Sequence, residues 1–353
     1  MTKNDGCVGV GVIGCGSISK WSHLPAYGAL AEAGLVQIVA VCDAVTERAE
    51  EMGRKYRTKA YSDYRDLLND KQIDAVSVCI SNHLHAPVTI AALLAGKHVL
   101  CEKPMATSQA EAQAMIDAAA QSGRKLMIAQ SQRYAPAHRK GKEVLDSKVL
   151  GRVLSFDTSF CHGGPEGWCA DHNNATWFFR KDLAHFGAMG DLGIHKADLL
   201  QYLLGERIVE AGAFIGTLAK RDEKDAPIQV DDNAVCILKT ESGIMGQLTA
   251  GWTYPSGEAN YTRIYCEKGI LRLYDHPDYA MIVEKSDGET IYHQIGKIFN
   301  NEKPEPSRVN QDFIDCIRKD TPPPISGADG CQALKVILAC FESARTRSIV
   351  RID

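Results

Sequence analysis

Short apolar runs alternate with helical patterns along the first third of the chain. The runs are apolar at consecutive positions, which predicts strands buried on both faces of a parallel sheet. The expected strands are 7–13, 36–42, 75–80, 98–101 and 125–129. The expected helices are 19–33, 46–56, 86–95 and 108–121, with glycines at 96 and 123 ending the last two. This order predicts a doubly wound α/β domain.

The pattern changes beyond about residue 151, where apolar segments are joined by short turns. The expected strands are 152–160, 207–218, 234–240, 244–252, 262–267, 270–274 and 280–285. Few helices intervene, so we expect an α+β domain with a large, open and mainly antiparallel sheet. Helices are expected at 191–204, 307–318 and 330–345. The chain is therefore predicted to form two domains, 1–130 and 131–353.

Composition narrows the class of protein. The 353 residues are 45% apolar and 24% charged, with a formal charge of −4, and nothing favours nucleic acid or an anionic membrane as a partner. We read no signal peptide and no apolar run of about 18 residues. Many of the 12 cysteines lie in apolar runs and no Cys-x-x-Cys pair occurs, which indicates a reducing compartment, the cytoplasm.

A glycine-rich turn joins the first expected strand to the first helix. It reads Gly14-Cys15-Gly16-Ser17-Ile18-Ser19. Gly14 permits a tight turn, and Gly16 lets the backbone approach a pyrophosphate at the helix N-terminus. Asp43 ends the second strand, where its carboxylate would accept from a ribose 2′-hydroxyl and repel a 2′-phosphate. The sequence therefore predicts NAD rather than NADP, against the alternative of a plain turn with a helix-capping Asp43.

Two further segments follow strands of the expected parallel sheet, at the edge where such folds bind ligands. Lys103 comes directly after the strand 98–101, where its ammonium could donate to a substrate oxygen and stabilise developing negative charge. The alternative is a solvated loop lysine. Residues 81–85 follow the strand 75–80 and are placed to touch the cofactor, although they could simply begin a helix.

The expected helix 191–204 contains a candidate proton-transfer pair. Asp191 and His195 are four residues apart and so share a helix face, with Asp198 one turn further on. A carboxylate beside an imidazole fixes its tautomer and raises its basicity, and such a histidine can exchange a proton with a reacting hydroxyl. The alternative is an exposed pair that only stabilises the helix.

Taken together, these motifs resemble the Gfo/Idh/MocA oxidoreductase family, which includes inositol dehydrogenases and glucose–fructose oxidoreductase. The resemblance covers about residues 7–350. It rests on Gly14-x-Gly16, Asn82-x-x-His85, Glu102-Lys103-Pro104, Arg133-Tyr134-x-Pro136 and Asp191-x-Gly193-x-His195-x-x-Asp198. One departure is His185-Phe186 before the helix, where the family usually has glycines, and it suggests a different substrate wall.

The resemblance implies a fold, a catalytic set and a partner. The fold is an N-terminal Rossmann domain plus a C-terminal domain whose open sheet often forms a dimer or tetramer interface. Lys103, Asp191 and His195 would be catalytic, with the ammonium and the imidazole converging on the reactive face of NAD. The cofactor residues that we expect are Gly14, Gly16, Ser17, Ile18, Asp43, Ser81, Asn82, His85, Glu102, Lys103 and Gln130. Lys103, Arg133, His162, Trp177, Arg180, Asp191 and His195 would contact substrate.

The segment 161–180 is rich in aromatic, histidine and amide side chains. We interpret it as a loop over the active site, with tryptophan rings on sugar C–H faces, although it could instead contact another subunit. Cys161, His162, Cys169 and His172 could alternatively bind zinc, but their spacing matches no familiar zinc motif, and we expect no metal.

The sequence therefore predicts an NAD(H)-dependent oxidoreductase acting on a secondary alcohol or ketone of a polyol, inositol or sugar. One alternative is an enzyme that retains NAD and oxidises transiently, as a glycosidase or epimerase does. Another is an NAD-binding regulatory protein without chemistry. The presence of Lys103, Asp191 and His195 together argues against the last of these.

Overall fold

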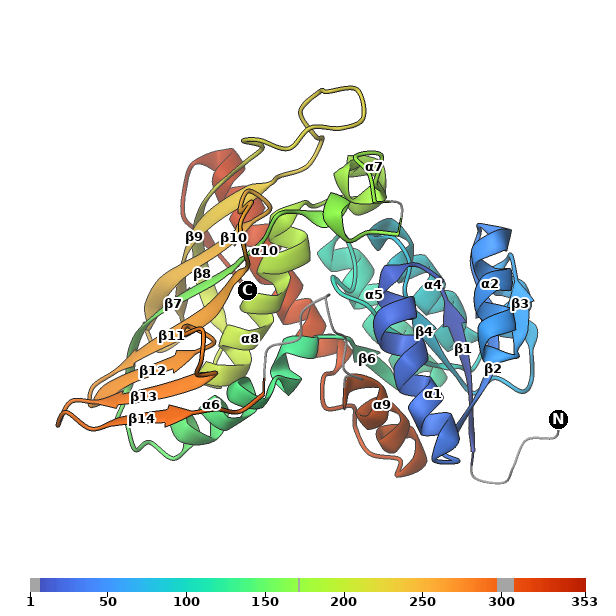
Figure 1. Ribbon diagram of the computed structural model, residues 1–353, viewed down its shortest axis with the longest axis horizontal. Coiled ribbons are helices and arrows are strands. Elements are labelled where there is room, and N and C mark those ends of the chain that lie inside the picture. Colours follow the sequence, from blue (N-terminus) through green and yellow to red (C-terminus); the bar gives the residue numbers. More distant parts are fainter. Residues whose placement is uncertain (1–6, 171, 297–307) are drawn as a thin grey trace. The chain divides into compact units, whose positions relative to one another are not determined.

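The computed structural model describes residues 7–170, 172–296 and 308–353 (Figure 1). Residue 307, the first of an expected helix, and residue 171 in the expected substrate segment lie outside this range. The chain divides into two compact units. One comprises the described residues of 1–130 and 301–331, and the other those of 131–300 and 332–353.

The first unit is built on a six-stranded parallel sheet, as the sequence predicts. Its strand order is β3-β2-β1-β4-β5-β6. The strands are β1 (Val8–Ile13), β2 (Val36–Cys42), β3 (Lys59–Tyr61), β4 (Ala75–Val78), β5 (His98–Cys101) and β6 (Leu126–Ile128). Every residue of β1 is buried, because this strand is paired on both sides, by β2 and β4. The short edge strand β3 was not expected, since only three residues form it.

Helices connect these strands. They are α1 (Leu24–Glu32), α2 (Thr46–Tyr56), α3 (Tyr64–Asn69), α4 (Asn82–Leu94), α5 (Gln109–Ser122) and α9 (Arg308–Arg318). Helix α1 packs against α9, and α4 packs against α5. Helix α4 begins four residues earlier than expected, so that residues 82–85 are helical rather than a loop.

The helix expected at 19–33 is not uniform. Its first turn, η1 (Ser19–His23), is a π-helical turn, and α1 continues from Leu24. A π turn accommodates one more residue than an α turn and is frequent at functional sites. His23 is the last residue of this turn and is 1% exposed.

The second unit is built on a nine-stranded sheet in the order β14-β13-β12-β11-β7-β10-β9-β8-β15. Its strands are β7 (Val153–Cys161), β8 (Ile208–Gly216), β9 (Asn233–Thr240), β10 (Met245–Gly251), β11 (Ala259–Cys266), β12 (Gly269–Leu273), β13 (Met281–Lys285), β14 (Thr290–His293) and β15 (Val350–Arg351). The predicted antiparallel arrangement is confirmed except between β7 and β10, which pair in parallel. The short edge strands β14 and β15 were not expected.

Helices cover one face of this sheet. Helix α6 (Pro136–Asp146) packs against β12, and α8 (Ile194–Leu204) packs against β7. Along β9 buried positions alternate with half-buried or exposed ones, so the opposite face of the sheet is open. Helix α10 (Gly327–Thr346) begins in the first unit and ends in the second. Throughout the described ranges, no helix is long and apolar enough to cross a bilayer.

A lysine is completely buried between α8 and the sheet. Lys196 is 0% exposed, and its Nζ donates to the Tyr261 carbonyl at 3.3 Å and to Thr262 Oγ1 at 3.4 Å. Its ammonium also lies 5.9 Å from the centre of the Phe160 ring. Burial lowers the pKa of Lys196 to about 7, although the charge of Glu258 opposes the shift. Burying this charge therefore destabilises the fold.

We expect Lys196→Met to stabilise the protein, because methionine fills a similar volume without a charge. The folded pKa is about 7 and the unfolded one about 10.4. The lysine is neutral in both states above the unfolded pKa, so no penalty exists there. The penalty grows as the pH falls below the unfolded pKa and is complete once the pH has fallen through 7. The gain in the free energy of unfolding should be about 1–4 kcal/mol at pH 6 and should shrink toward pH 10. Urea unfolding at pH 6, 8 and 10 measures it.

The control is Lys140→Met on α6, whose side chain is half exposed and paired with Glu143. It should change stability little and without a trend in pH. A loss of stability in Lys196→Met at pH 6 would contradict the assigned cost of the buried charge.

Candidate functional site

The turn after β1 has the geometry that a pyrophosphate requires. Gly14 has φ +98°, and a Cβ there would lie 2.0 Å from the Cys79 carbonyl oxygen, so only glycine fits. A Cβ on Gly16 would meet nothing within 4 Å. Ser17 is half-buried and Ile18 is exposed, so this side of the turn is accessible. Backbone can therefore approach a ligand at Gly16.

Asp43 follows β2 and braces the same turn. Its Oδ2 accepts from the Cys15 backbone N–H at 2.8 Å, and its Oδ1 accepts from Val45 N–H at 2.8 Å. The carboxylate is half-buried beside the glycine turn, as the sequence predicts for a ribose-binding acid. Each carboxylate oxygen can accept more than one hydrogen bond, so Asp43 can also accept from a further donor.

The residues expected after β4 and β6 lie at the same edge of the sheet as the glycine turn. Ser81 is the N-cap of α4, and Asn82 is buried. His85 is 1% exposed, with its ring nitrogens at hydrogen-bonding distance from the carbonyls of Ile80 and Pro104. Gln130 is 1% exposed, and neither atom of its amide has a hydrogen-bond partner in the described ranges. An unsatisfied buried amide fits a polar ligand such as the cofactor.

The turn after β5 presents Lys103. The preceding Glu102 is buried and the following Pro104 is buried, whereas Lys103 itself is half-buried. Glu102 Oε2 accepts from the Lys103 backbone N–H at 3.2 Å. The lysine therefore extends from a fixed backbone at an accessible edge, as the sequence predicts.

In the second unit, Asp191 and His195 lie at the beginning of the long helix. Asp191 is in the π-helical turn η5 (Met189–Gly193) and His195 in the first turn of α8. Asp191 and His195 are 7% and 8% exposed, so the alternative of an exposed, merely helix-stabilising pair is wrong. Trp252 Nε1–H donates to Asp191 Oδ2 at 3.3 Å. This hydrogen bond orients the carboxylate.

Asp231 holds the N-terminus of that helix. Its two oxygens accept from the backbone N–H groups of Gly187 and Met189, each at 2.7 Å. A Cβ on Gly187 would lie 1.7 Å from the Asp231 carbonyl oxygen, so the two segments meet backbone to backbone. Burial raises the pKa of Asp231 to about 6, although the two backbone hydrogen bonds oppose the shift. This buried carboxylate fixes the turn that contains Asp191.

Aromatic rings connect His195 to the segment 161–180. The Phe160 ring lies 5.9 Å from both the His195 and the His162 ring centres, and His162 is 6.3 Å from Trp168. The structure thus brings His162 toward the candidate proton-transfer residue. His162 Nδ1 accepts from the Gly164 backbone N–H at 2.9 Å.

Three other residues expected to contact substrate have protein partners. Arg133 forms a bidentate ion pair with Asp198, in which Nε donates to Oδ2 at 2.7 Å and Nη2 donates to Oδ1 at 2.6 Å. Arg180 is exposed and forms a similar pair with Asp182. Trp177 stacks on Phe178 with ring centres 3.9 Å apart. Their contact with a substrate stays a prediction.

Some residues of the site were missed by sequence reasoning. Asp231 and Trp252 come from strands or loops far along the chain from residue 191, and His23 lies in an ordinary helical pattern. The Asp231-Asp232 doublet before an apolar strand was the one signal available. No group of three or more His, Cys, Asp or Glu residues with metal-binding geometry occurs where the structure is described, and Cys161 instead contacts Ser159.

Comparison with known proteins matches both units. The family model GFO_IDH_MocA, described as "Oxidoreductase family, NAD-binding Rossmann fold", matches residues 8–130. The GFO/IDH/MocA C-terminal domain matches residues 138–272. The two matches together span more than half of the chain.

The chain is also similar to individual proteins of known activity and to a solved structure. Levoglucosan dehydrogenase of Pseudarthrobacter phenanthrenivorans is 33% identical over 305 residues, covering 79% of this chain and 76% of the relative. Inositol 2-dehydrogenase of Salmonella typhimurium is 33% identical over 211 residues, and this match spans 58% of the chain and only about half (56%) of the relative. A solved levoglucosan dehydrogenase in complex with NADH and L-sorbose is 28% identical, with a TM-score of 0.85 and coverage of 98% and 99%.

We expect Asp43→Ala to weaken NADH binding and to relax discrimination against NADPH. The variant removes the acceptor for the ribose hydroxyls and the charge that repels a 2′-phosphate. The dissociation constant of NADPH divided by that of NADH should fall by about tenfold or more. This change corresponds to a free-energy difference of roughly 1.4 kcal/mol. Fluorescence titration of each nucleotide measures it.

Glu47→Ala is the matched control, because Glu47 is an exposed carboxylate in the first turn of α2. It should leave both affinities unchanged. An NADH-to-NADPH preference that persists in Asp43→Ala would assign cofactor selection to other residues.

Proposed function

The chain belongs to the Gfo/Idh/MocA family of NAD-binding oxidoreductases, and we propose that it transfers a hydride between NAD and a secondary alcohol or ketone of a polyol, inositol or sugar derivative. The family match confirms the resemblance read from the sequence. The observation on which the proposal rests is the buried Asp191 and His195 at a helix start, together with an accessible Lys103 after β5.

Each of these residues has a chemical role in the proposal. His195 accepts the hydroxyl proton during oxidation and returns it during reduction. Asp191, oriented by Trp252, favours the protonated form of the imidazole. Lys103 donates to the reacting oxygen and stabilises its negative charge. Gly14, Gly16, Asp43 and Gln130 would hold NAD, which would supply the hydride acceptor or donor.

The aromatic surroundings of His195 support a cyclic, hydroxyl-bearing substrate. Phe160 and Trp168 offer ring faces for the C–H side of a sugar or cyclitol, and His162 offers a polar edge. The relatives described above act, by their names, on levoglucosan and inositol. Such compounds are therefore the substrate class that we propose for this chain.

The proposal is tested by screening inositols, levoglucosan, aldoses, glycosides and their keto forms for a change in NADH absorbance. Net NADH formation is expected with one of these. Turnover of a glycoside without NADH accumulation would favour transient oxidation instead. NADH binding without turnover of any compound would favour a regulatory protein.

With the active compound, Lys103→Ala and His195→Ala should each lower kcat by about 10²–10⁴-fold, because each removes a group that acts on the reacting oxygen. In His195→Ala the dissociation constant of NADH should stay within about twofold, because His195 is not among the expected cofactor residues. Lys181→Ala, at an exposed lysine, and His293→Ala, on β14, are matched controls and should retain full kcat. Unchanged kcat in Lys103→Ala would refute its assigned role.

We also propose that a second copy of the chain covers the open face of the nine-stranded sheet. The register places Phe214 opposite Val235, and Gly212 opposite Ile237. Phe214 is 87% and Ile237 67% exposed, and Met245 on the next strand is also exposed. Such neighbouring exposed apolar side chains are typical of an interface, and a self-complementary patch forms a two-fold dimer.

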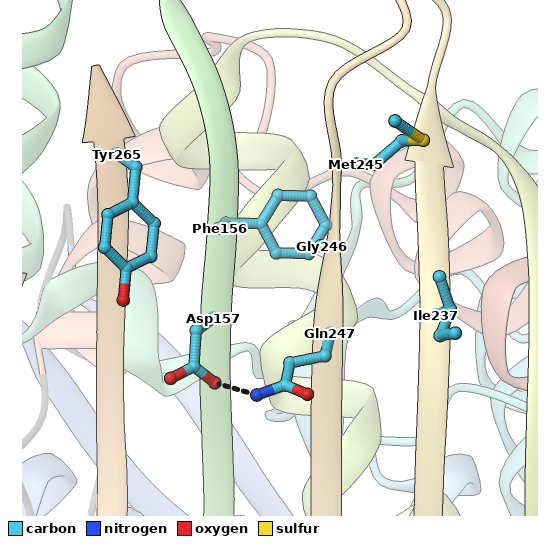
Figure 2. A pocket seen from close by; sticks show the side chains of 7 residues that line it. All are labelled: Phe156, Asp157, Ile237, Met245, Gly246, Gln247 and Tyr265. Atoms are coloured by element: carbon cyan, nitrogen blue, oxygen red, sulfur yellow. Dashed lines mark hydrogen bonds between the residues drawn. The ribbon is translucent and has the colours of Figure 1, made fainter.

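The same face is hollowed. A cavity of about 430 Å³ is lined by Phe156, Asp157, Ile237, Met245, Gly246, Gln247 and Tyr265. Figure 2 shows Asp157 and Gln247 joined by a hydrogen bond, of 3.0 Å, beside the apolar side chains of Met245 and Ile237. The hollow is widely open and lies beside the exposed Ile237 and Met245, which supports a surface covered by another copy.

We expect Ile237→Asp to dissociate the assembly, because a charge in a desolvated interface lacks a partner. Analytical ultracentrifugation should show a dimer or tetramer for the natural chain and smaller species for the variant. Leu94→Asp, at an exposed leucine of the first unit, should leave the assembly intact. A natural chain that is monomeric at micromolar concentration would overturn this part of the proposal.

The cysteines support the proposed cytoplasmic location. All twelve lie within the described ranges and are free thiols, and eleven of them are buried. Free thiols on this scale are typical of a reducing compartment.

A further inference from the structure

A buried carboxylate lies directly behind Lys103. Glu102 is 8% exposed, and its two oxygens have different donors. Oε1 accepts from His23 Nε2 at 2.9 Å, whereas Oε2 accepts from the Lys103 backbone N–H at 3.2 Å. One carboxylate therefore joins the π-helical turn before α1 to the backbone of the proposed catalytic lysine.

The hydrogen bonds continue away from Glu102 through fully buried groups. His23 Nδ1 lies 3.1 Å from Ser77 Oγ and 3.3 Å from Asn310 Nδ2, and the Tyr27 hydroxyl lies 2.7 Å from Ser77 Oγ. An ionised carboxylate oxygen only accepts, so His23 Nε2 carries the proton, and Nδ1 of the neutral ring is a single acceptor that Ser77 Oγ and Asn310 Nδ2 share. The bonds then run in one direction: Tyr27 to Ser77, Ser77 to His23, and His23 to Glu102. Bonds aligned in this way strengthen one another.

This network keeps Glu102 ionised. Burial alone would raise the pKa of Glu102, but the hydrogen bond from His23 and the charge of Lys103 oppose it, and the pKa lies below its ordinary value. The carboxylate therefore remains an acceptor for both donors at neutral pH. A protonated Glu102 would have to turn its hydroxyl toward one of them and lose that bond.

The turn is also held on its other side. His85 Nδ1 lies 2.7 Å from the Pro104 carbonyl, and His85 is buried. Two buried histidines, from α4 and from the turn before α1, thus fix the residues on either side of Lys103. The half-buried lysine side chain is the accessible part of this turn.

We propose that His23 is a positioning residue for Lys103, acting through the Glu102 carboxylate. This inference rests on the proposed function, in which Lys103 acts on the reacting oxygen. Misplacement of a reacting group by about 1 Å can lower a rate by 10²-fold, so a fixed backbone at Lys103 matters more for kcat than for nucleotide binding.

The first test needs no substrate. A histidine N–H that donates to a buried carboxylate gives a downfield proton resonance that exchanges slowly with water. We expect such a signal from protein labelled with ¹⁵N-histidine, and its loss in both His23→Leu and Glu102→Leu. Its absence from the natural protein, or its persistence in Glu102→Leu, would overturn the network.

The second test is a double-mutant cycle with Lys103→Ala, measured as oxidation of levoglucosan or myo-inositol. His23→Leu should lower kcat at least tenfold and leave the NADH dissociation constant within about twofold. In the Lys103→Ala background it should have no further effect, because the group on which it acts is gone. His23→Gln, which can still donate to Glu102, should restore most of kcat.

The outcomes separate the two claims. Equal effects of His23→Leu in both backgrounds would show a merely structural role and overturn the inference alone. Unchanged kcat in Lys103→Ala would instead refute the proposed function. If His23→Leu does not fold, Glu102→Gln takes its place, since it keeps the shape and loses one acceptor. His138→Gln is the matched control, because His138 is equally buried but lies in the second unit, and its effect should be the same in both backgrounds.

Discussion

Buried or half-buried carboxylates that accept backbone N–H groups hold each functional turn of this protein in place. Asp43 fixes the glycine turn through Cys15, Glu102 fixes the backbone of Lys103, and Asp231 fixes the turn before Asp191. A carboxylate accepts from two directions and prefers a fixed donor to mobile water when it is buried. Loops that would otherwise fluctuate therefore acquire the rigidity of the sheets to which they are attached.

The sequence predicted the regular part of the fold because that part depends on local pattern. Strands such as 36–42 and helices such as 46–56 agree with the structure residue by residue, since consecutive burial and helical periodicity are both visible in the sequence. Three short edge strands, β3, β14 and β15, were missed, because so few residues produce no period. The parallel pairing of β7 with β10 was also missed, because the partner of a strand is fixed by long-range packing.

The candidate site divides in the same way. Gly14, Asp43 and Lys103 could be proposed as site residues because each follows a recognisable strand, and a strand end in a parallel sheet is a place where ligands bind. Trp252, Asp231 and His23 could not, because each acts on a residue distant in sequence through a single hydrogen bond. The two π-helical turns were equally invisible, since one additional residue in a helix changes the direction of its side chains without changing its composition. It is therefore easier to identify from a sequence pattern the side chains proposed to react than the side chains that hold those in position.

Burying ionisable groups near the candidate site lowers the stability of the fold, and the proposed chemistry gives a reason for their presence. Lys196 and Asp231 are buried with shifted pKa values, and both adjoin the helix that contains His195. Hydrophobic residues of similar volume would often be more stable at such positions. A group that must exchange a proton needs neighbours whose dipoles and charges are fixed before the reaction, because reorienting them during the reaction raises the barrier. The stability given up at these few positions is small beside the apolar core of the two sheets, and it is concentrated beside the residue that we propose to exchange the proton.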